Sequence, residues 1–205
     1  ELCTNTDLDT LLKTKGRLPE REARAILLQL LCAMKYLARP DDNRPGIIHY
    51  DLKPGNILFD NIGDAKITDF GLSKIVENAA DSMELTSQGA GTYWYLPPEC
   101  FMDDDKVRIS NKVDVWSIGV VYFQMLYNKR PFGDGQTQDR ILTDGTMLNA
   151  KVVKFPETNI VSKLAKDFIE VCLTYDQAFR PTIAQICEHP YVLQKEFEQG
   201  ELDVR

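Results

Sequence analysis

Apolar residues recur at intervals of three and four positions near the start of the chain. Thr6 or Asp7 can cap a short amphipathic helix that Gly16 ends. Pro19 suits the first turn of a second, longer helix. The spacing of the apolar positions in this second helix predicts one wide buried face. That face comprises Ala23, Ile26, Leu27, Leu30, Leu31, Met34 and Leu37.

Short runs of β-type residues follow the second helix, at residues 47–48, 57–59 and 65–68. The last two are separated by the turn-forming sequence DNIGD, which predicts a small hairpin. Residues 72–91 are rich in Ser, Thr, Gly, Asn and Ala and show no periodicity. Compact domains seldom contain so long an irregular stretch unless it has a function, so we expect a functional surface loop there.

Residues 113–126 are apolar almost all round, which predicts a helix that is buried on every side and forms the core of the domain. Two more helices follow. One covers residues 164–173, and the other starts with Thr182 and Gln185 in capping-box positions and ends before Pro190. Because helices outnumber strands, the predicted fold class is mainly α: a helical bundle around a buried central helix, with short β-hairpins.

The composition agrees with a single globular domain. The 205 residues include 24 Lys and Arg against 31 Asp and Glu, a net charge of −7, which excludes the basic signature of a direct nucleic-acid binder. Five cysteines without a CxxC pair indicate reduced thiols in a reducing, intracellular compartment. The most apolar stretch is shorter than the roughly 18 residues of a membrane span, so we expect no membrane insertion.

The polar motif with the clearest chemistry is HYDLKPGN at residues 49–56, followed by DFG thirteen residues after Asn56. Phosphoryl transfer needs a base that orients the attacking hydroxyl and hard oxygen ligands that hold Mg²⁺ against the triphosphate. Asp51 can accept a hydrogen bond from a substrate hydroxyl. Asn56 and Asp69 carry oxygen atoms of the kind that bind Mg²⁺.

These motifs, with Pro97-Pro98-Glu99 after them, resemble the HRDLxxxN, DFG and APE signature of the eukaryotic protein kinases. The resemblance covers essentially the whole chain. It implies that Asp51 is the catalytic base and that Lys53 neutralises the transferring phosphoryl group of ATP. It also implies that Asn56 and Asp69 are the Mg²⁺ ligands.

The resemblance further implies a partial kinase domain over residues 1–205. This part would comprise the hinge and the C-terminal lobe, with a catalytic loop at 49–56 and an activation segment at 69–99. The N-terminal lobe would be absent. The implied nucleotide-binding residues are Glu1 and Cys3 at the hinge, Asp7 at the ribose and Leu58 beneath the adenine base.

Other positions match structural features of the kinase family. The DLKPxN loop is followed by GTYWYLPPE, in which Thr92 stands where it can hydrogen-bond Asp51 and Lys53. This combination resembles serine/threonine kinases rather than tyrosine kinases. Glu99 resembles the glutamate that pairs with a buried arginine, here Arg180. Asp114 resembles the helix aspartate that holds the backbone of the catalytic loop.

Three segments, HYDLKPGN, ITDFGLSKI and ELTSQGAGTYWYLPPECF, together resemble the Tousled-like serine/threonine kinases. This likeness implies a nuclear protein linked to chromatin assembly, with protein substrates that carry Ser or Thr acceptors and with histone chaperones as partners. It also implies self-association through a coiled-coil region outside these residues.

The sequence departs from the family pattern in two main respects. It contains no GxGxxG loop and no matching strand lysine, so we expect these 205 residues alone to transfer phosphate negligibly. We also expect an exposed apolar surface where the smaller lobe would dock in cis.

The second departure is Tyr50, which replaces the arginine that clamps a phosphorylated loop residue in most of these kinases. Lys74 is the only basic residue in the loop from 72 to 91. We therefore hypothesise that activity depends less on such a clamp here. The candidate phosphate acceptors in the loop are Ser73, Ser82, Thr86 and Ser87.

Three functions are compatible with these observations. The first is an active serine/threonine kinase, which the full set Asp51, Lys53, Asn56 and Asp69 favours. The second is a pseudokinase or scaffold that binds nucleotide or protein partners without catalysis. The third is a lobe that mainly docks proteins through the region after Glu99.

Overall fold

The computed structural model describes residue 3 and residues 6–40, 44–76, 83–84, 90–102, 108–157 and 161–194. The helices are α1 (Leu8–Lys15), α2 (Glu20–Ala38), α3 (Lys112–Tyr127), α4 (Gln138–Thr143), α5 (Lys163–Cys172), α6 (Ile183–Ile186) and α7 (Pro190–Leu193). The strands are β1 (Gly46–Ile48), β2 (Ile57–Phe59), β3 (Ala65–Ile67), β4 (Lys74–Val76), β5 (Met83–Glu84) and β6 (Arg108–Ile109).

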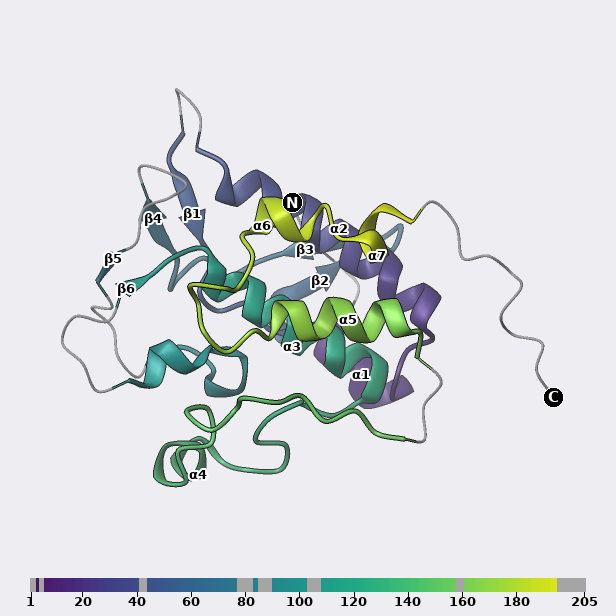
Figure 1. Cartoon of the computed structure of the whole chain (residues 1–205). Coiled ribbons are helices and arrows are strands. Elements are labelled where there is room, and N and C mark those ends of the chain that lie inside the picture. Colours follow the sequence, from purple (N-terminus) through teal and green to yellow (C-terminus); the bar gives the residue numbers. More distant parts are fainter. Residues whose placement is uncertain are drawn as a thin grey trace.

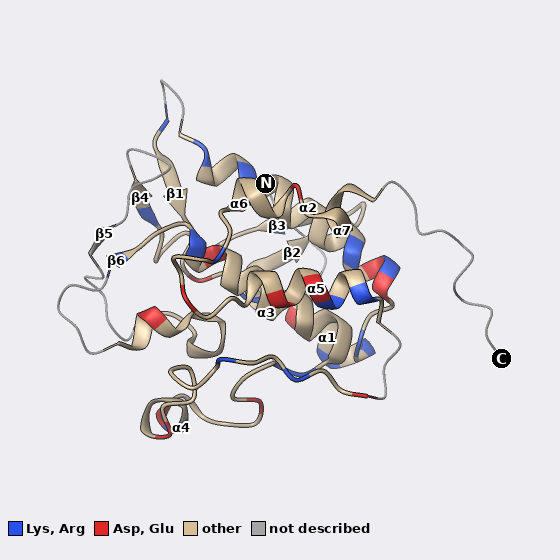
Figure 2. Cartoon of the chain, viewed as in Figure 1, with Lys and Arg blue, Asp and Glu red and all other residues tan. Residues whose placement is uncertain are grey.

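The core is built around α3, as the apolar run at 113–126 predicts. Its side chains are buried on all faces, and α2, α5 and α6 pack around it (Figure 1). Helix α3 carries only two charged residues, Lys112 and Asp114, whereas the outer helix α5 carries Lys and Asp or Glu residues in close succession (Figure 2). A mostly apolar, enclosed helix of this kind contributes a large apolar surface to the core.

The helix ends follow from local side chains. Asp7 caps α1 by accepting a hydrogen bond from the Thr10 amide at 2.7 Å, and Gly16 ends that helix with a φ of 77°. The capping box of Thr182 and Gln185 opens α6 as predicted. These three features confirm the helix boundaries expected from the sequence.

The three strand pairs in the described part of the chain are antiparallel. The hairpin β2–β3 pairs Ile57 with Ile67, as the DNIGD turn predicts, and β3 packs against α2. Strand β1 pairs with β4, in the register Ile48 opposite Lys74, and β5 pairs with β6. The strands β1, β4, β5 and β6 gather at one side of the molecule, at the left of Figure 1.

The structure corrects the sequence prediction in three places. Residues 74–76, assigned to the irregular loop, form β4 because β1 supplies a partner from far along the chain. Helix α4 was not predicted; the Thr137 hydroxyl caps it by accepting from the Arg140 amide at 3.3 Å. Pro190 does not simply follow the last helix, because it opens a further short helix, α7.

None of the described helices is long and apolar enough to cross a membrane. The five cysteines are free thiols. Phe70, Ile62 and Ile75 are exposed by 45%, 79% and 68% of their surfaces, which places large apolar side chains in solvent near the hairpin β2–β3 and on β4.

The contact between α3 and α5 depends on a glycine. A Cβ atom at Gly119 would lie 2.7 Å from Cys172 Cβ and 2.9 Å from Leu173 Cδ2. We predict that Gly119→Ala lowers the free energy of unfolding by about 1–3 kcal/mol, because the two helices must move apart. Gly55→Ala is the control, since nothing lies within 4 Å of the added Cβ. Urea denaturation measures both; equal stability of the two variants would contradict the close contact.

Candidate active site

The catalytic loop is held by Asp114, a carboxylate that projects from the buried helix α3. Its Oδ2 accepts from the His49 amide at 2.8 Å and its Oδ1 from the Tyr50 amide at 2.9 Å. Burial raises the pKa of Asp114, and the two backbone hydrogen bonds oppose that rise. Tyr50 has a positive φ of 69°, which turns the chain so that both amides point at one carboxylate.

The next residue, Asp51, forms a closed triangle with Lys53 and Thr92. Lys53 Nζ lies 2.6 Å from Asp51 Oδ2 and donates to Thr92 Oγ1 at 2.9 Å. Thr92 Oγ1 in turn donates to Asp51 Oδ1 at 3.0 Å. Asp51 is 7% exposed, so this triangle holds the carboxylate in one orientation at the edge of the core.

Asn56 and Asp69 come together through the hairpin β2–β3. The Thr68 amide donates to the Asn56 carbonyl at 3.0 Å. Asp69 is the next residue after Thr68, so this hydrogen bond sets its backbone beside that of Asn56. The Asn56 amide group donates to the Asp51 carbonyl at 2.8 Å and to Asp51 Oδ2 at 3.1 Å. This orientation leaves the side-chain oxygen of Asn56 for another ligand.

These oxygens fit a Mg²⁺ ion. Asp69 is exposed and has a positive φ of 64°, and its Oδ1 accepts from the Gly71 amide at 3.3 Å. The described residues contain no group of three His, Cys, Asp or Glu side chains that could hold a metal ion on their own. Mg²⁺ in phosphoryl-transfer sites binds one or two protein oxygens together with substrate phosphates, which is the donor set that Asn56 and Asp69 provide.

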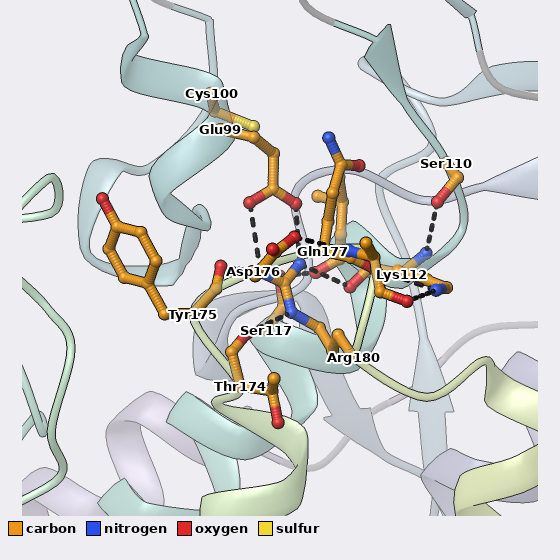
Figure 3. Close-up of polar contacts among 12 residues, drawn as sticks. Glu99, Cys100, Ser110, Lys112, Ser117, Thr174, Tyr175, Asp176, Gln177 and Arg180 are labelled. Carbon is orange, nitrogen blue, oxygen red and sulfur yellow. Dashed lines mark hydrogen bonds and ion pairs between the residues drawn. The ribbon is translucent and has the colours of Figure 1, made fainter.

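The activation segment is anchored at its far end by a buried ion pair (Figure 3). Arg180 donates to the two carboxylate oxygens of Glu99 at 2.7 and 3.1 Å, and neither side chain is more than 3% exposed. Its remaining donors reach backbone carbonyls, those of Thr174 at 2.9 Å, Tyr175 at 3.1 Å and Lys112 at 3.2 Å. The pairing expected between Glu99 and Arg180 is present, and every charge in it is compensated.

Tyr50 is buried in a small apolar cluster that includes Val76 and Leu96 of the activation segment. It is 1% exposed, and its hydroxyl donates to Cys100 Sγ at 3.7 Å. Burial raises the pKa of the Tyr50 hydroxyl, so it stays neutral. Lys74 Nζ lies 5.1 Å from the centre of the Tyr50 ring, within reach of a cation–π contact.

Of the four predicted phosphate acceptors in the loop, Ser82, Thr86 and Ser87 lie outside the described residues.

The predicted nucleotide-binding residues are only partly brought together. Asp7 pairs with Leu58 through an isolated β-bridge, and Leu58 is half-buried. Both carboxylate oxygens of Asp7 are engaged by Thr10, whose hydroxyl donates to the second at 3.1 Å. Cys3 is half-buried, and Glu1 lies outside the described residues. The nucleotide-binding roles of these four residues therefore remain predictions.

Two anchors of the activation segment were missed by the sequence analysis. Ser117 Oγ donates to the Tyr95 carbonyl at 2.8 Å, and the Tyr95 hydroxyl donates to Gln124 Oε1 at 2.7 Å. Ser117 and Gln124 are isolated polar residues in the apolar helix α3. Because a buried polar group needs a partner, their presence in that helix was the available signal.

Comparison with known proteins places this fold and site in a family. The model of the protein kinase domain matches residues 1–192. The chain therefore belongs to the protein kinase family.

Within that family, the chain is 55% identical over 195 residues to the serine/threonine-protein kinase TOUSLED of Arabidopsis thaliana. It is 51% identical over 201 residues to tousled-like 2 of Homo sapiens and 50% identical over 200 residues to tousled-like 1 of Mus musculus. These alignments cover 94% of the chain but only 28%, 26% and 26% of the respective relatives. The chain thus spans about a quarter of the length of these curated relatives.

The buried pair allows a stability test. We predict that Arg180→Ala costs about 3–5 kcal/mol of unfolding free energy, because Glu99 is left as an unpaired buried charge. Arg140→Ala removes a solvent-exposed pair with Asp144 and should cost less than about 1 kcal/mol. Chemical denaturation compares the two. Similar small losses in both variants would mean that the Glu99 carboxylate reaches solvent.

Proposed function

We propose that the intact gene product is a serine/threonine protein kinase that transfers the γ-phosphate of ATP to hydroxyl groups of protein substrates. The observation that carries this proposal is the triangle of Asp51, Lys53 and Thr92, which presents an oriented carboxylate beside a cation. The names of the relatives, all serine/threonine kinases, support the same activity.

In the proposed mechanism, Asp51 accepts the hydrogen bond of the attacking hydroxyl and takes its proton as the phosphate is transferred. Lys53, already bound to Asp51 Oδ2, offsets negative charge on the phosphoryl group. Thr92 keeps the two side chains together. Asn56 and Asp69 would hold Mg²⁺, which when bound neutralises the phosphates of ATP.

The choice of serine and threonine over tyrosine rests on the same triangle. Thr92 joins the activation segment to Lys53 and Asp51 by direct hydrogen bonds. The acceptor hydroxyl must come close to Asp51, which suits the short reach of a serine or threonine side chain.

The nucleotide site is proposed to include Glu1, Cys3, Asp7 and Leu58, with the adenine base over Leu58. The 205 residues contain no GxGxxG motif to cover the phosphates. We therefore assign the activity to the intact gene product, with the smaller lobe completing the site in cis, and propose that these residues alone transfer phosphate negligibly.

The likeness to the Tousled-like kinases supports a nuclear location and a link to chromatin, with histone chaperones among the partners. It also supports self-association through regions outside this chain. The net charge of −7 supports recognition of proteins rather than direct recognition of nucleic acid.

One prediction of the proposed function concerns Asp51. In the intact gene product, Asp51→Asn should reduce phosphate transfer to a mixed Ser/Thr protein substrate by about 10²- to 10⁴-fold, because the amide cannot accept the proton. Asp139→Asn, at an exposed position on α4, is the matched control. Radiolabelled MgATP with phosphoamino-acid analysis reports the transfer. If the wild type labels nothing but still binds nucleotide, the scaffold function replaces the kinase.

A second prediction concerns the activation segment. Because Tyr50 is neutral, buried and directed at Cys100, a phosphate on the loop has no arginine at this position to bind. Replacing Ser82, Thr86 and Ser87 together by Ala should therefore leave most of the activity of the intact gene product. Phosphate mapping by mass spectrometry accompanies the assay. Complete loss of activity would instead indicate ordinary control by loop phosphorylation.

A further inference from the structure

His49 has one ring nitrogen without a hydrogen bond. The side chain is fully buried, and its Nε2 lies 3.1 Å from the Thr68 carbonyl oxygen. A carbonyl oxygen can only accept, so Nε2 carries a proton, and in the tautomer with its single proton at Nε2 the other nitrogen, Nδ1, is an acceptor. Nδ1 is buried and has no partner among the described residues.

Ser73 has the complementary group. Its hydroxyl oxygen is buried and has no hydrogen-bond partner in the described part of the chain. Its amide donates to the Phe70 carbonyl at 3.1 Å, which fixes the turn between the DFG motif and β4. An enclosed hydroxyl is not available to a protein kinase, so this arrangement also argues against Ser73 as a phosphate acceptor.

The register of β1 and β4 brings the two groups to the same place. Ile47 lies opposite Ile75 and Ile48 opposite Lys74, which is the last pair of the ladder. His49 and Ser73 are the residues that come next on the two strands, and continuing the antiparallel register would set them opposite each other, where Cβ atoms lie about 4.5–5.5 Å apart. An unused donor and an unused acceptor thus share the end of one strand pair.

We propose that the Ser73 hydroxyl donates to His49 Nδ1, either directly after rotation about χ1 or through one enclosed water molecule. This bond satisfies both groups, which are costly to leave unpaired in the core. It makes Ser73 a positioning residue. His49 is two residues from Asp51 in the chain, and its ring contacts the Phe70 ring edge-on at 5.0 Å. Ser73 therefore links the start of the activation segment to the catalytic loop.

The variants Ser73→Thr and Ser73→Val have side chains of nearly the same shape, and only Ser73→Thr keeps the hydroxyl. Comparing them separates the effect of the hydroxyl from the effect of side-chain volume. His49 and His189 are the only histidines of the chain, so ¹⁵N labelling of histidine gives a spectrum with two rings. His189 is the internal control, because its Nδ1 accepts from the Tyr191 amide at 3.2 Å and its Nε2 lies 3.1 Å from Asp167 Oδ2.

We expect the Nδ1 resonance of His49 to move in Ser73→Val and to keep its wild-type position in Ser73→Thr, while both His189 resonances stay in place. Identical His49 spectra in the wild type and in Ser73→Val would overturn the proposal. Movement of His189 together with His49 in Ser73→Val would also overturn it, because that pattern reports a general rearrangement rather than a local hydrogen bond.

The catalytic consequence rests on the proposed kinase function and is measured in the intact gene product. Ser73→Val should lower kcat by up to roughly tenfold, the effect expected of one hydrogen bond, with little change in KM for MgATP. Ser73→Thr should restore the wild-type kcat. Equal kcat values in the two variants would overturn the positioning role. The NMR comparison needs no activity, so failure of the kinase assay alone would be distinguishable from failure of this proposal.

Discussion

The structure depends on one buried carboxylate. Asp114 stands in the first turn of an otherwise apolar helix, and a charge in that position is costly unless donors surround it. The donors are the amides of His49 and Tyr50. The core helix and the catalytic loop therefore require one another: the helix supplies the acceptor, and the loop must adopt the positive φ of Tyr50 to reach it. Asp51 is placed as the next residue along that loop.

The activation segment is attached to the same scaffold at successive points. Thr92 binds the catalytic pair, Tyr95 binds α3 at both its carbonyl and its hydroxyl, and Glu99 binds Arg180. Thr92 donates to a carboxylate, Tyr95 forms hydrogen bonds between uncharged groups, and Glu99 forms an ion pair. The side chains of this ion pair are almost fully buried. The segment between 90 and 101 is thus held by three attachments that need no arginine at position 50.

Local signals in the sequence predicted the local parts of this structure. The apolar run of α3, the DNIGD hairpin and the capping box of α6 all depend on neighbouring residues, and all are present. Strand β4 depends on pairing with β1, which no local pattern encodes. The motifs predicted which residue types form the site. Thr92 is 41 positions from Asp51, so their hydrogen bond could be predicted only from the resemblance to kinases. The burial of the Ser73 hydroxyl depends on tertiary packing that no local pattern encodes.

The burial of Cys100 against Tyr50 also governs thiol chemistry beside the catalytic loop. Burial raises the pKa of Cys100 to about 12, so at physiological pH the sulfur keeps its proton. Alkylating reagents and peroxides attack the thiolate, and a protonated, enclosed sulfur is a poor target. Cys32 is exposed on α2, and Cys3 and Cys187 are half-buried. Covalent labels would therefore react first at Cys32 on the outer surface, and the sulfur beside the catalytic loop would be protected by the fold itself.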